Sequence, residues 1–185
     1  MRKIGMVIVV AFVFMISGCN KTKTLPYISE NDFLRYWEKS DLCDHVLGTG
    51  DTYIVNLPNG TIRYCMFEDV FDAQKNFEDT RDAFEETKNN GDFKGNYYSD
   101  IREQRTMLEM RGAGRAYTTK DCYVGEILID GKIYDETSES SSYFYGGIYL
   151  CGDIVIEAYT GSSSHEDQKV IQDFLGAFEY PIPEK

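Results

Sequence analysis

Three stretches of the chain repeat apolar residues at the spacing of a helix. The first follows Ser29, which can cap a helix with Asp32 three positions later, and runs to about Cys43. The second begins at Asp69 and the third follows Ser164. Their apolar stripes are, in order, Phe33, Leu34 and Trp37; Val70, Phe77 and Phe84; and Val170, Ile171, Phe174, Leu175 and Phe178. The pattern therefore predicts three amphipathic helices.

Between these helices the chain alternates short strand-like runs with turn signals. Reversals are expected at 58–60, 130–131 and 151–153, where glycine stands beside Asn or Asp. The strand-like runs are 53–57, 61–67, 106–110, 116–119, 123–129, 132–134, 143–150 and 154–159. Residues 91–100 and 136–142 are expected to be polar loops. Together the elements predict a single α+β domain, with an antiparallel β-sheet of hairpins and helices packed on one face.

The N-terminus has the layout of an export signal. Arg2 and Lys3 precede an uncharged apolar run that begins at Ile4 and ends just before Cys19. The run is shorter than the roughly 20 apolar residues that cross a bilayer as a helix. The segment therefore indicates export from the cytoplasm.

Ile16, Ser17, Gly18 and Cys19 resemble the lipobox of bacterial lipoproteins, which reads aliphatic, small, Gly or Ala, then Cys. The resemblance covers only the signal, and Ile stands where Leu is more usual. It implies cleavage before Cys19, a diacylglyceryl thioether on that cysteine, and a lipid anchor on the extracytoplasmic face of a cell membrane. An ordinary secretory signal and an uncleaved N-terminal helix are the alternatives.

This interpretation divides the chain into three parts. Residues 1–18 are the signal peptide, 19–27 are the lipidated cysteine and a short tether, and 28–185 are the ectodomain. After cleavage 167 residues remain, which suffice for one hydrophobic core. The sequence leaves open whether the inner or the outer membrane holds the anchor.

The mature chain is strongly acidic. It has 17 Lys and Arg against 31 Asp and Glu, so its formal charge is −14. Nucleic acid and anionic lipid surfaces both attract clustered Lys and Arg, so the balance argues against them as partners. It allows a basic partner or a bound cation, and it equally fits a solvated acidic surface.

Four cysteines remain after Cys19: Cys43, Cys65, Cys122 and Cys151. An even number in an exported chain suggests two disulfides. The expected pairs are Cys43 with Cys65 and Cys122 with Cys151. Their long spacings lack a C-x-x-C motif, which gives a zinc site or a redox motif little support.

No catalytic, metal or cofactor motif is recognised in the chain. It has only two histidines: His45 follows Asp44, and His165 lies at an expected helix start among three serines and Glu166. No motif joins either histidine to a nucleophile. The glycines of 112–114 lie between expected strands, where a bulge is the ordinary meaning of glycine. An enzyme would therefore need a site assembled from scattered acidic residues together with one of the histidines.

Tyrosine is frequent in the second half of the chain. Tyr97, Tyr98, Tyr143 and Tyr145 are candidates for a binding surface, because tyrosine combines a flat apolar ring with a polar hydroxyl. The alternative is packing within the sheet, where aromatic residues are common. Exposure of Tyr143 and Tyr145 beside Tyr97 and Tyr98 would favour binding.

These features give three hypotheses of different class. The first is a non-catalytic, membrane-anchored binding or sensing module for a protein, peptide or envelope component. The second is a cell-envelope hydrolase or enzyme accessory subunit, and the third is a purely structural lipoprotein. Residues 143–178 are loosely similar to the closing hairpin and helix of extracellular sensor-type lipoprotein domains, a resemblance of pattern that assigns no residue a function.

Overall fold

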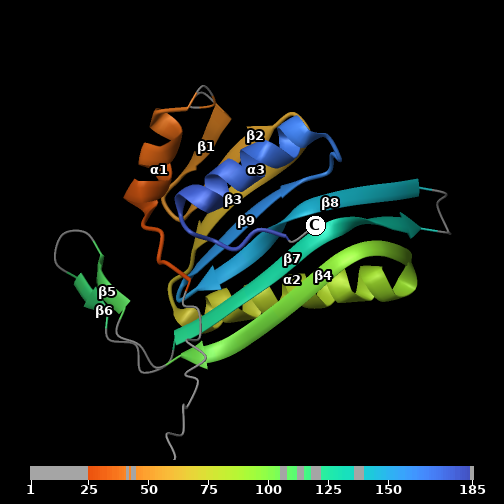
Figure 1. The fold of residues 1–185 in the computed structure, drawn as a ribbon. Helices are drawn as coiled ribbons and strands as arrows, with labels where there is room; N and C mark the ends of the chain where they lie inside the picture. Colours follow the sequence, from red (N-terminus) through yellow and green to blue (C-terminus); the bar gives the residue numbers. More distant parts are fainter. Residues whose placement is uncertain are drawn as a thin grey trace, which may run out of the picture.

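One seven-stranded antiparallel sheet organises the fold (Figure 1). The computed structural model describes residues 25–40, 42, 45–104, 108–111, 115–117, 122–135 and 140–183. The elements are α1 (Glu30–Glu38), β1 (Val46–Thr49), β2 (Thr52–Leu57), β3 (Gly60–Met66), α2 (Val70–Asn90), β4 (Asp92–Gln104), β5 (Leu108–Arg111), β6 (Arg115–Tyr117), β7 (Cys122–Asp135), β8 (Ser140–Cys151), β9 (Ile154–Thr160) and α3 (His165–Ala177).

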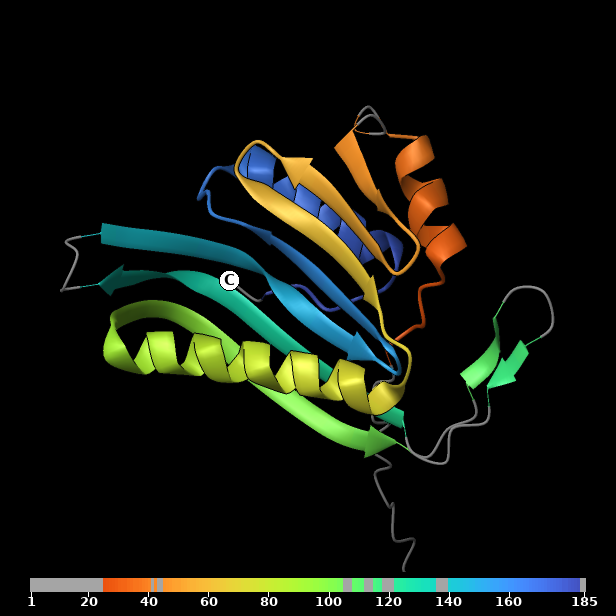
Figure 2. The same ribbon diagram turned by 180° about the vertical axis from the view of Figure 1, so that it is seen from behind.

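The strands follow the order β1-β2-β3-β9-β8-β7-β4, and every neighbouring pair is antiparallel. The short strand β1 and the long strand β4 are therefore the two edges of the sheet. Strands β5 and β6 form a separate hairpin, which extends away from the sheet between β4 and β7 (Figure 2).

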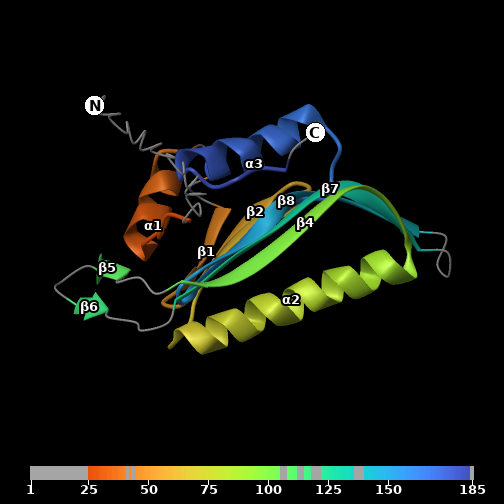
Figure 3. The same ribbon diagram turned by 60° about the horizontal axis from the view of Figure 1, so that its bottom comes forward.

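Helices cover both faces of the sheet (Figure 3). Helices α1 and α3 lie on one face, where Phe33, Trp37 and Phe174 join a core with side chains of β2, β3, β8 and β9. Helix α2 lies on the other face, where Ala73 and Phe77 form a second core with β7, β8 and β9. The α+β class and the antiparallel sheet are confirmed.

Helices were expected on one face of the sheet, but they cover both faces. The residue pattern of the central strands explains the difference. Tyr149 of β8 belongs to the core under α1 and α3, whereas its neighbours Ile148 and Leu150 belong to the core under α2. Successive strand residues point to opposite faces, so an unbroken apolar run needs a helix on each side.

All three helices start at the expected capping residues. The Ser29 hydroxyl accepts a hydrogen bond from the Asp32 amide at 3.1 Å, and Asp69 accepts from the first turn of α2. Ser164 likewise accepts from the Asp167 amide at 3.2 Å. Each side chain satisfies an amide that the helix itself leaves unpaired. The first helix ends at Glu38 instead of near Cys43.

Three expectations about the middle of the chain are wrong, one of them the loop at 136–142, because β8 already begins at Ser140. Residues 92–100 are not a loop, because they belong to the strand β4, and residues 130–131 are not a turn, because β7 continues through them. A Cβ on Gly131 would lie 2.7 Å from the Phe93 ring. Glycine at this position makes room for the aromatic ring of the neighbouring strand instead of reversing the chain.

Residues 25–27 belong to the folded domain. Leu25 is buried, and the Cys151 thiol donates to the Leu25 carbonyl at 3.4 Å. Residues 25–27, expected to be part of the tether, are thus joined to the domain. The predicted signal, Cys19 and the tether up to residue 24 lie outside the described residues. None of the helices in the described ranges is both long and apolar enough to cross a bilayer.

Candidate binding site

An open groove of about 690 Å³ lies where β4 and β7 face the C-terminal segment. We call it the β4 groove, and its lining residues are Gly95, Asn96, Tyr97, Tyr98, Glu126, Leu128, Pro181, Ile182 and Pro183. One wall is the edge strand and the other is the chain that follows α3. The site therefore joins the middle of the chain to its C-terminal end.

The register of β4 with β7 builds the floor. Tyr98 lies opposite Leu128, and Asp100 lies opposite Glu126. Helix α3 packs mainly on β8 and β9, so these positions of β4 and β7 are not covered by it. The same sheet face is thus a helix-covered core over its central strands and an accessible surface near the β4 edge.

The C-terminal wall is held in place by two buried tyrosines. Tyr149 of β8 donates a hydrogen bond from its hydroxyl to the Pro181 carbonyl at 2.5 Å. Tyr180 packs its ring 4.9 Å from that of Tyr149 and donates to the Pro26 carbonyl at 2.8 Å. Burial raises the pKa of both tyrosines well above the usual value, so both hydroxyls stay protonated donors.

Gly147 leaves room for the Tyr149 hydroxyl that holds the C-terminal wall. A Cβ on Gly147 would lie 2.3 Å from the Tyr149 hydroxyl, so only glycine leaves space for that hydroxyl to reach the wall. The wall is therefore ordered before a ligand arrives, which lowers the entropic cost of binding.

The groove combines apolar surface with negative charge. Tyr98 is 47% exposed and Ile182 is 41% exposed, so both present large apolar surfaces to solvent beside the half-buried Leu128. Glu126 supplies a carboxylate at the floor, and prolines at 181 and 183 have no amide to donate. This chemistry suits a ligand with apolar groups and positive charge.

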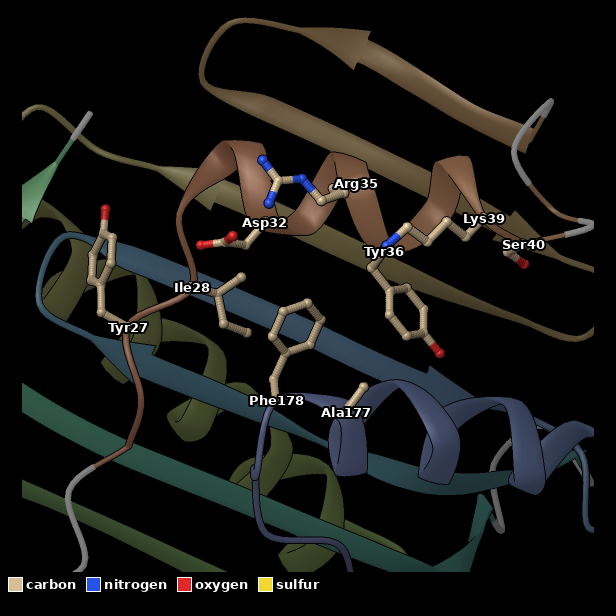
Figure 4. Close-up of a pocket in the computed structure, with 9 residues that line it drawn as sticks. All are labelled: Tyr27, Ile28, Asp32, Arg35, Tyr36, Lys39, Ser40, Ala177 and Phe178. Atoms are coloured by element: carbon tan, nitrogen blue, oxygen red, sulfur yellow. The ribbon is translucent and has the colours of Figure 1, made fainter. Parts of the chain in front are cut away.

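A second pocket of about 490 Å³ lies between α1 and the end of α3 (Figure 4). The Tyr36 ring extends from α1 toward α3, and Ile28 and Phe178 lie beside it. Tyr36 makes close ring contacts with the buried Trp37 and Phe174. Burial, with a smaller contribution from nearby Asp173, raises the pKa of Tyr36. The aromatic side chains of this pocket pack α1 against α3 as part of the hydrophobic core. This structural role explains their presence without a ligand.

The structure separates the first two candidate tyrosines. Both residues line the β4 groove, but the half-buried ring of Tyr97 packs against the core under α2, on the opposite face of the sheet from Tyr98. The Lys88 ammonium lies 4.3 Å from the centre of the Tyr97 ring, and the Tyr97 hydroxyl donates to Glu85 at 3.5 Å. Because neighbours on a strand point to opposite faces, the two rings cannot share one surface.

Tyr143 and Tyr145 bind α3 to the sheet. Gln172 donates to the Tyr145 hydroxyl at 2.6 Å, and Gln168 donates to the Tyr143 hydroxyl at 3.0 Å. Tyr143 in turn donates to Asp130 at 2.6 Å, and burial together with this bond raises the pKa of Tyr143 to about 12. Tyr145 is only 1% exposed. The structure therefore does not bring the four tyrosines together on one exposed surface.

The cysteines are placed as follows. Cys43 lies outside the described residues, so its pairing with Cys65 stays a prediction. Cys122 and Cys151 are buried as thiols on the neighbouring strands β7 and β8, and Val124 is the residue opposite Cys151. The two cysteines are thus diagonal neighbours on one sheet face, and their expected disulfide also stays a prediction.

The two histidines are both exposed and lie on different elements, His45 just before β1 and His165 at the start of α3. Neither lines the β4 groove or the pocket beside α1. Within the described ranges, no group of three or more His, Cys, Asp or Glu side chains is arranged to hold a metal ion.

Sequence reasoning found Tyr98 and missed the opposite wall. Pro181 and Pro183 follow the last helix, where proline is typical of a helix end, but two prolines flanking Ile182 are also typical of an extended segment that presents its middle side chain. No protein-family model, no curated protein and no solved structure matches the chain. The assignment of a function therefore depends on the groove itself.

Proposed function

We propose that this protein is a membrane-anchored extracytoplasmic lipoprotein that acts as a non-catalytic binding or sensing module. Its ligand is a basic, partly apolar segment of another envelope protein, held in the β4 groove. One observation carries the proposal: Tyr98 and Ile182, two of the few large apolar side chains exposed on the described surface, face the same groove from its two walls.

The charge of the chain supports a basic ligand. The full chain has a formal charge of −12, and Glu126 places a carboxylate within the groove. A negative field speeds the encounter with a cationic partner and disfavours anionic ones. Nucleic acid, which is anionic, is therefore not the proposed partner.

The hydrolase or accessory-subunit hypothesis has no comparable support among the described residues. Such an activity needs acidic groups that converge with a histidine in one pocket. The β4 groove contributes one carboxylate, from Glu126. The two histidines that could act as a base, His45 and His165, line neither the groove nor the pocket beside α1. We therefore propose no catalytic residue and no cofactor.

The test of the proposed function is a comparison of two blocked peptides, one alternating lysine with valine and the other glutamate with valine. We expect the lysine peptide to bind the full chain at least about tenfold more tightly, and the preference to shrink as salt rises, because salt screens exposed charges. Isothermal titration calorimetry at two salt concentrations measures both effects. Equal affinities, or tighter binding of the glutamate peptide, would contradict the proposal.

Matched charge reversals locate the effect. Glu126→Lys changes the groove, and Glu38→Lys makes the same change in net charge on the exposed end of α1. Only Glu126→Lys is expected to remove most of the preference for the lysine peptide. Thermal unfolding of both variants checks that the fold is kept.

The anchor has its own test. Cys19→Ala removes the thiol that the lipobox resemblance assigns to the lipid, so the variant is expected to leave the membrane fraction. Cell fractionation of wild type and Cys19→Ala measures this, with Cys65→Ala as a control that keeps the lipobox intact. A Cys19→Ala protein that stays in the membrane fraction would refute the lipid anchor.

A further inference from the structure

We infer that the ligand segment binds as an added β-strand along the free edge of β4. This inference deepens the proposed function, on which it rests, by naming how the basic segment is held. In strand addition the backbone of the edge supplies hydrogen bonds, and neighbouring side chains select the sequence.

The first argument concerns the outer edge of β4. Along its 13 residues it pairs on one side with β7, and no other described strand pairs with it on the outer side. In Figures 1 and 2, β4 forms the outer border of the sheet. Gly95, Asn96 and Tyr98 are exposed at this border. An edge strand presents a row of N–H and C=O groups that a further strand can use.

The second argument is that the centre of this edge carries few of the features that prevent strand pairing. Proteins protect long edges with proline, with lysine, by shortness or by bulges. The opposite edge, β1, is short and contains Gly48 with a φ of 116°. On β4 the only lysine, Lys94, and the irregular Gly95 lie before Asn96–Asp100, a segment that has neither proline nor lysine and carries a single charged residue, Asp100.

The third argument is charge on both sides of the edge. On the groove face Glu126 lies beside Tyr98, and on the α2 face Glu85 accepts a hydrogen bond from Ser99 at 3.4 Å. The cations of the strand are already paired with its own acids, Lys94 with Asp92 at 2.8 Å and Arg102 with Asp100. On the groove face an added strand therefore meets the carboxylate of Glu126, which complements lysine or arginine, whereas on the α2 face Glu85 is accompanied by the Lys88 ammonium 4.3 Å from the centre of the Tyr97 ring.

The fourth argument is that the groove continues the same edge. A strand paired with Asn96–Asp100 directs alternate side chains to opposite faces. One set would contact Tyr98 and Ile182 in the β4 groove, and the other would lie beside Tyr97 above α2. The groove thus recognises every second residue of the bound segment, while the edge binds its backbone.

The experiment is amide hydrogen exchange, measured by NMR on the full chain purified in detergent, with and without the lysine–valine peptide. In the free protein, alternate amides of Asn96–Asp100 are expected to exchange fast because they point outward. Saturating peptide is expected to slow those amides at least about tenfold, while the amides bonded to β7 are slow in both states. A peptide N-methylated on every residue keeps the side chains but cannot pair, and it is expected to bind at least about tenfold more weakly.

The outcomes separate this inference from the proposed function. Binding of the lysine–valine peptide with unchanged exchange along β4, and equal binding of the N-methylated peptide, would overturn strand addition and leave groove binding intact. Failure of the lysine–valine peptide to bind at all would overturn both. Slowed exchange confined to alternate β4 amides would support both.

Discussion

Replacing Tyr98 with serine is expected to weaken binding of the lysine–valine peptide by roughly thirtyfold, or about 2 kcal/mol, the usual loss for an aromatic hot spot. The ring is the largest exposed side chain that lines the β4 groove, and Leu128 opposite it completes an apolar floor. Serine keeps a hydroxyl but removes the ring, so the loss measures the apolar contact. Calorimetric titration of the full chain gives the change in Kd.

Leu47→Ser is the matched control for Tyr98→Ser. Leu47 is 55% exposed on β1, the opposite edge of the sheet, so its replacement also removes an exposed apolar side chain from an edge strand. It is expected to leave the Kd unchanged within about twofold. Equal weakening by both substitutions, or no weakening by Tyr98→Ser, would mean that the peptide does not use the β4 groove.

Phe174→Ala is expected to lower the free energy of unfolding by about 3–5 kcal/mol, the usual range for a buried phenylalanine. Phe174 of α3 is fully buried, and its ring stacks on Trp37 of α1 with 5.6 Å between ring centres. The substitution leaves a cavity between the two helices and the sheet. Urea unfolding followed by fluorescence measures the loss, and the signal is local because Trp37 is the single tryptophan of the chain.

Phe71→Ala tests whether burial, and not loss of a phenylalanine as such, causes this effect. Phe71 is 57% exposed in the first turn of α2, although its ring lies 5.9 Å from that of Tyr123. Its replacement is expected to cost about 1 kcal/mol or less. A loss for Phe174→Ala as small as that for Phe71→Ala would contradict the packing described for α1 and α3.

Local signals in the sequence were sufficient for the starts of the helices. Ser29, Asp69 and Ser164 cap their helices through hydrogen bonds to amides two or three positions later, so the information for each start lies within one helical turn. The reversal at Gly152, with a φ of 65°, is equally local because it requires a residue that accepts a left-handed conformation. These features are the ones that the sequence predicts correctly.

The edge of the sheet could not be predicted in this way. Residues 92–100 are polar and contain glycine, which is typical of loops, and they form a strand because β7 provides a partner along their whole length. Gly131 resembles a turn signal, yet its role depends on Phe93 from another strand. Such information is distributed between paired residues that lie 26 to 42 positions apart in the chain, from Asp100 with Glu126 to Asp92 with Tyr134, so a local pattern does not contain it.

The same separation explains why half of the candidate site was missed. Tyr98 was recognised by its residue type, whereas the opposite wall exists because Tyr149 binds the Pro181 carbonyl. Tyr143 and Tyr145 have the residue type of a binding surface, but Gln168 and Gln172 on α3 occupy their hydroxyls. Whether a tyrosine binds a ligand or the rest of the protein is decided by which helix covers it.

The hydrogen bond from Tyr180 to the Pro26 carbonyl joins the two ends of the fold at one point. Tension applied to the chain before Leu25 reaches this bond at once, and Tyr180 is followed directly by the wall of the β4 groove. A force on the N-terminus and a ligand bound against residues 181–183 therefore both act on the segment around Tyr180. With the proposed anchor and the proposed ligand in place, a pull between them would pass through this short segment and through β8, whose Cys151 and Tyr149 bond to Leu25 and Pro181, and not through α1.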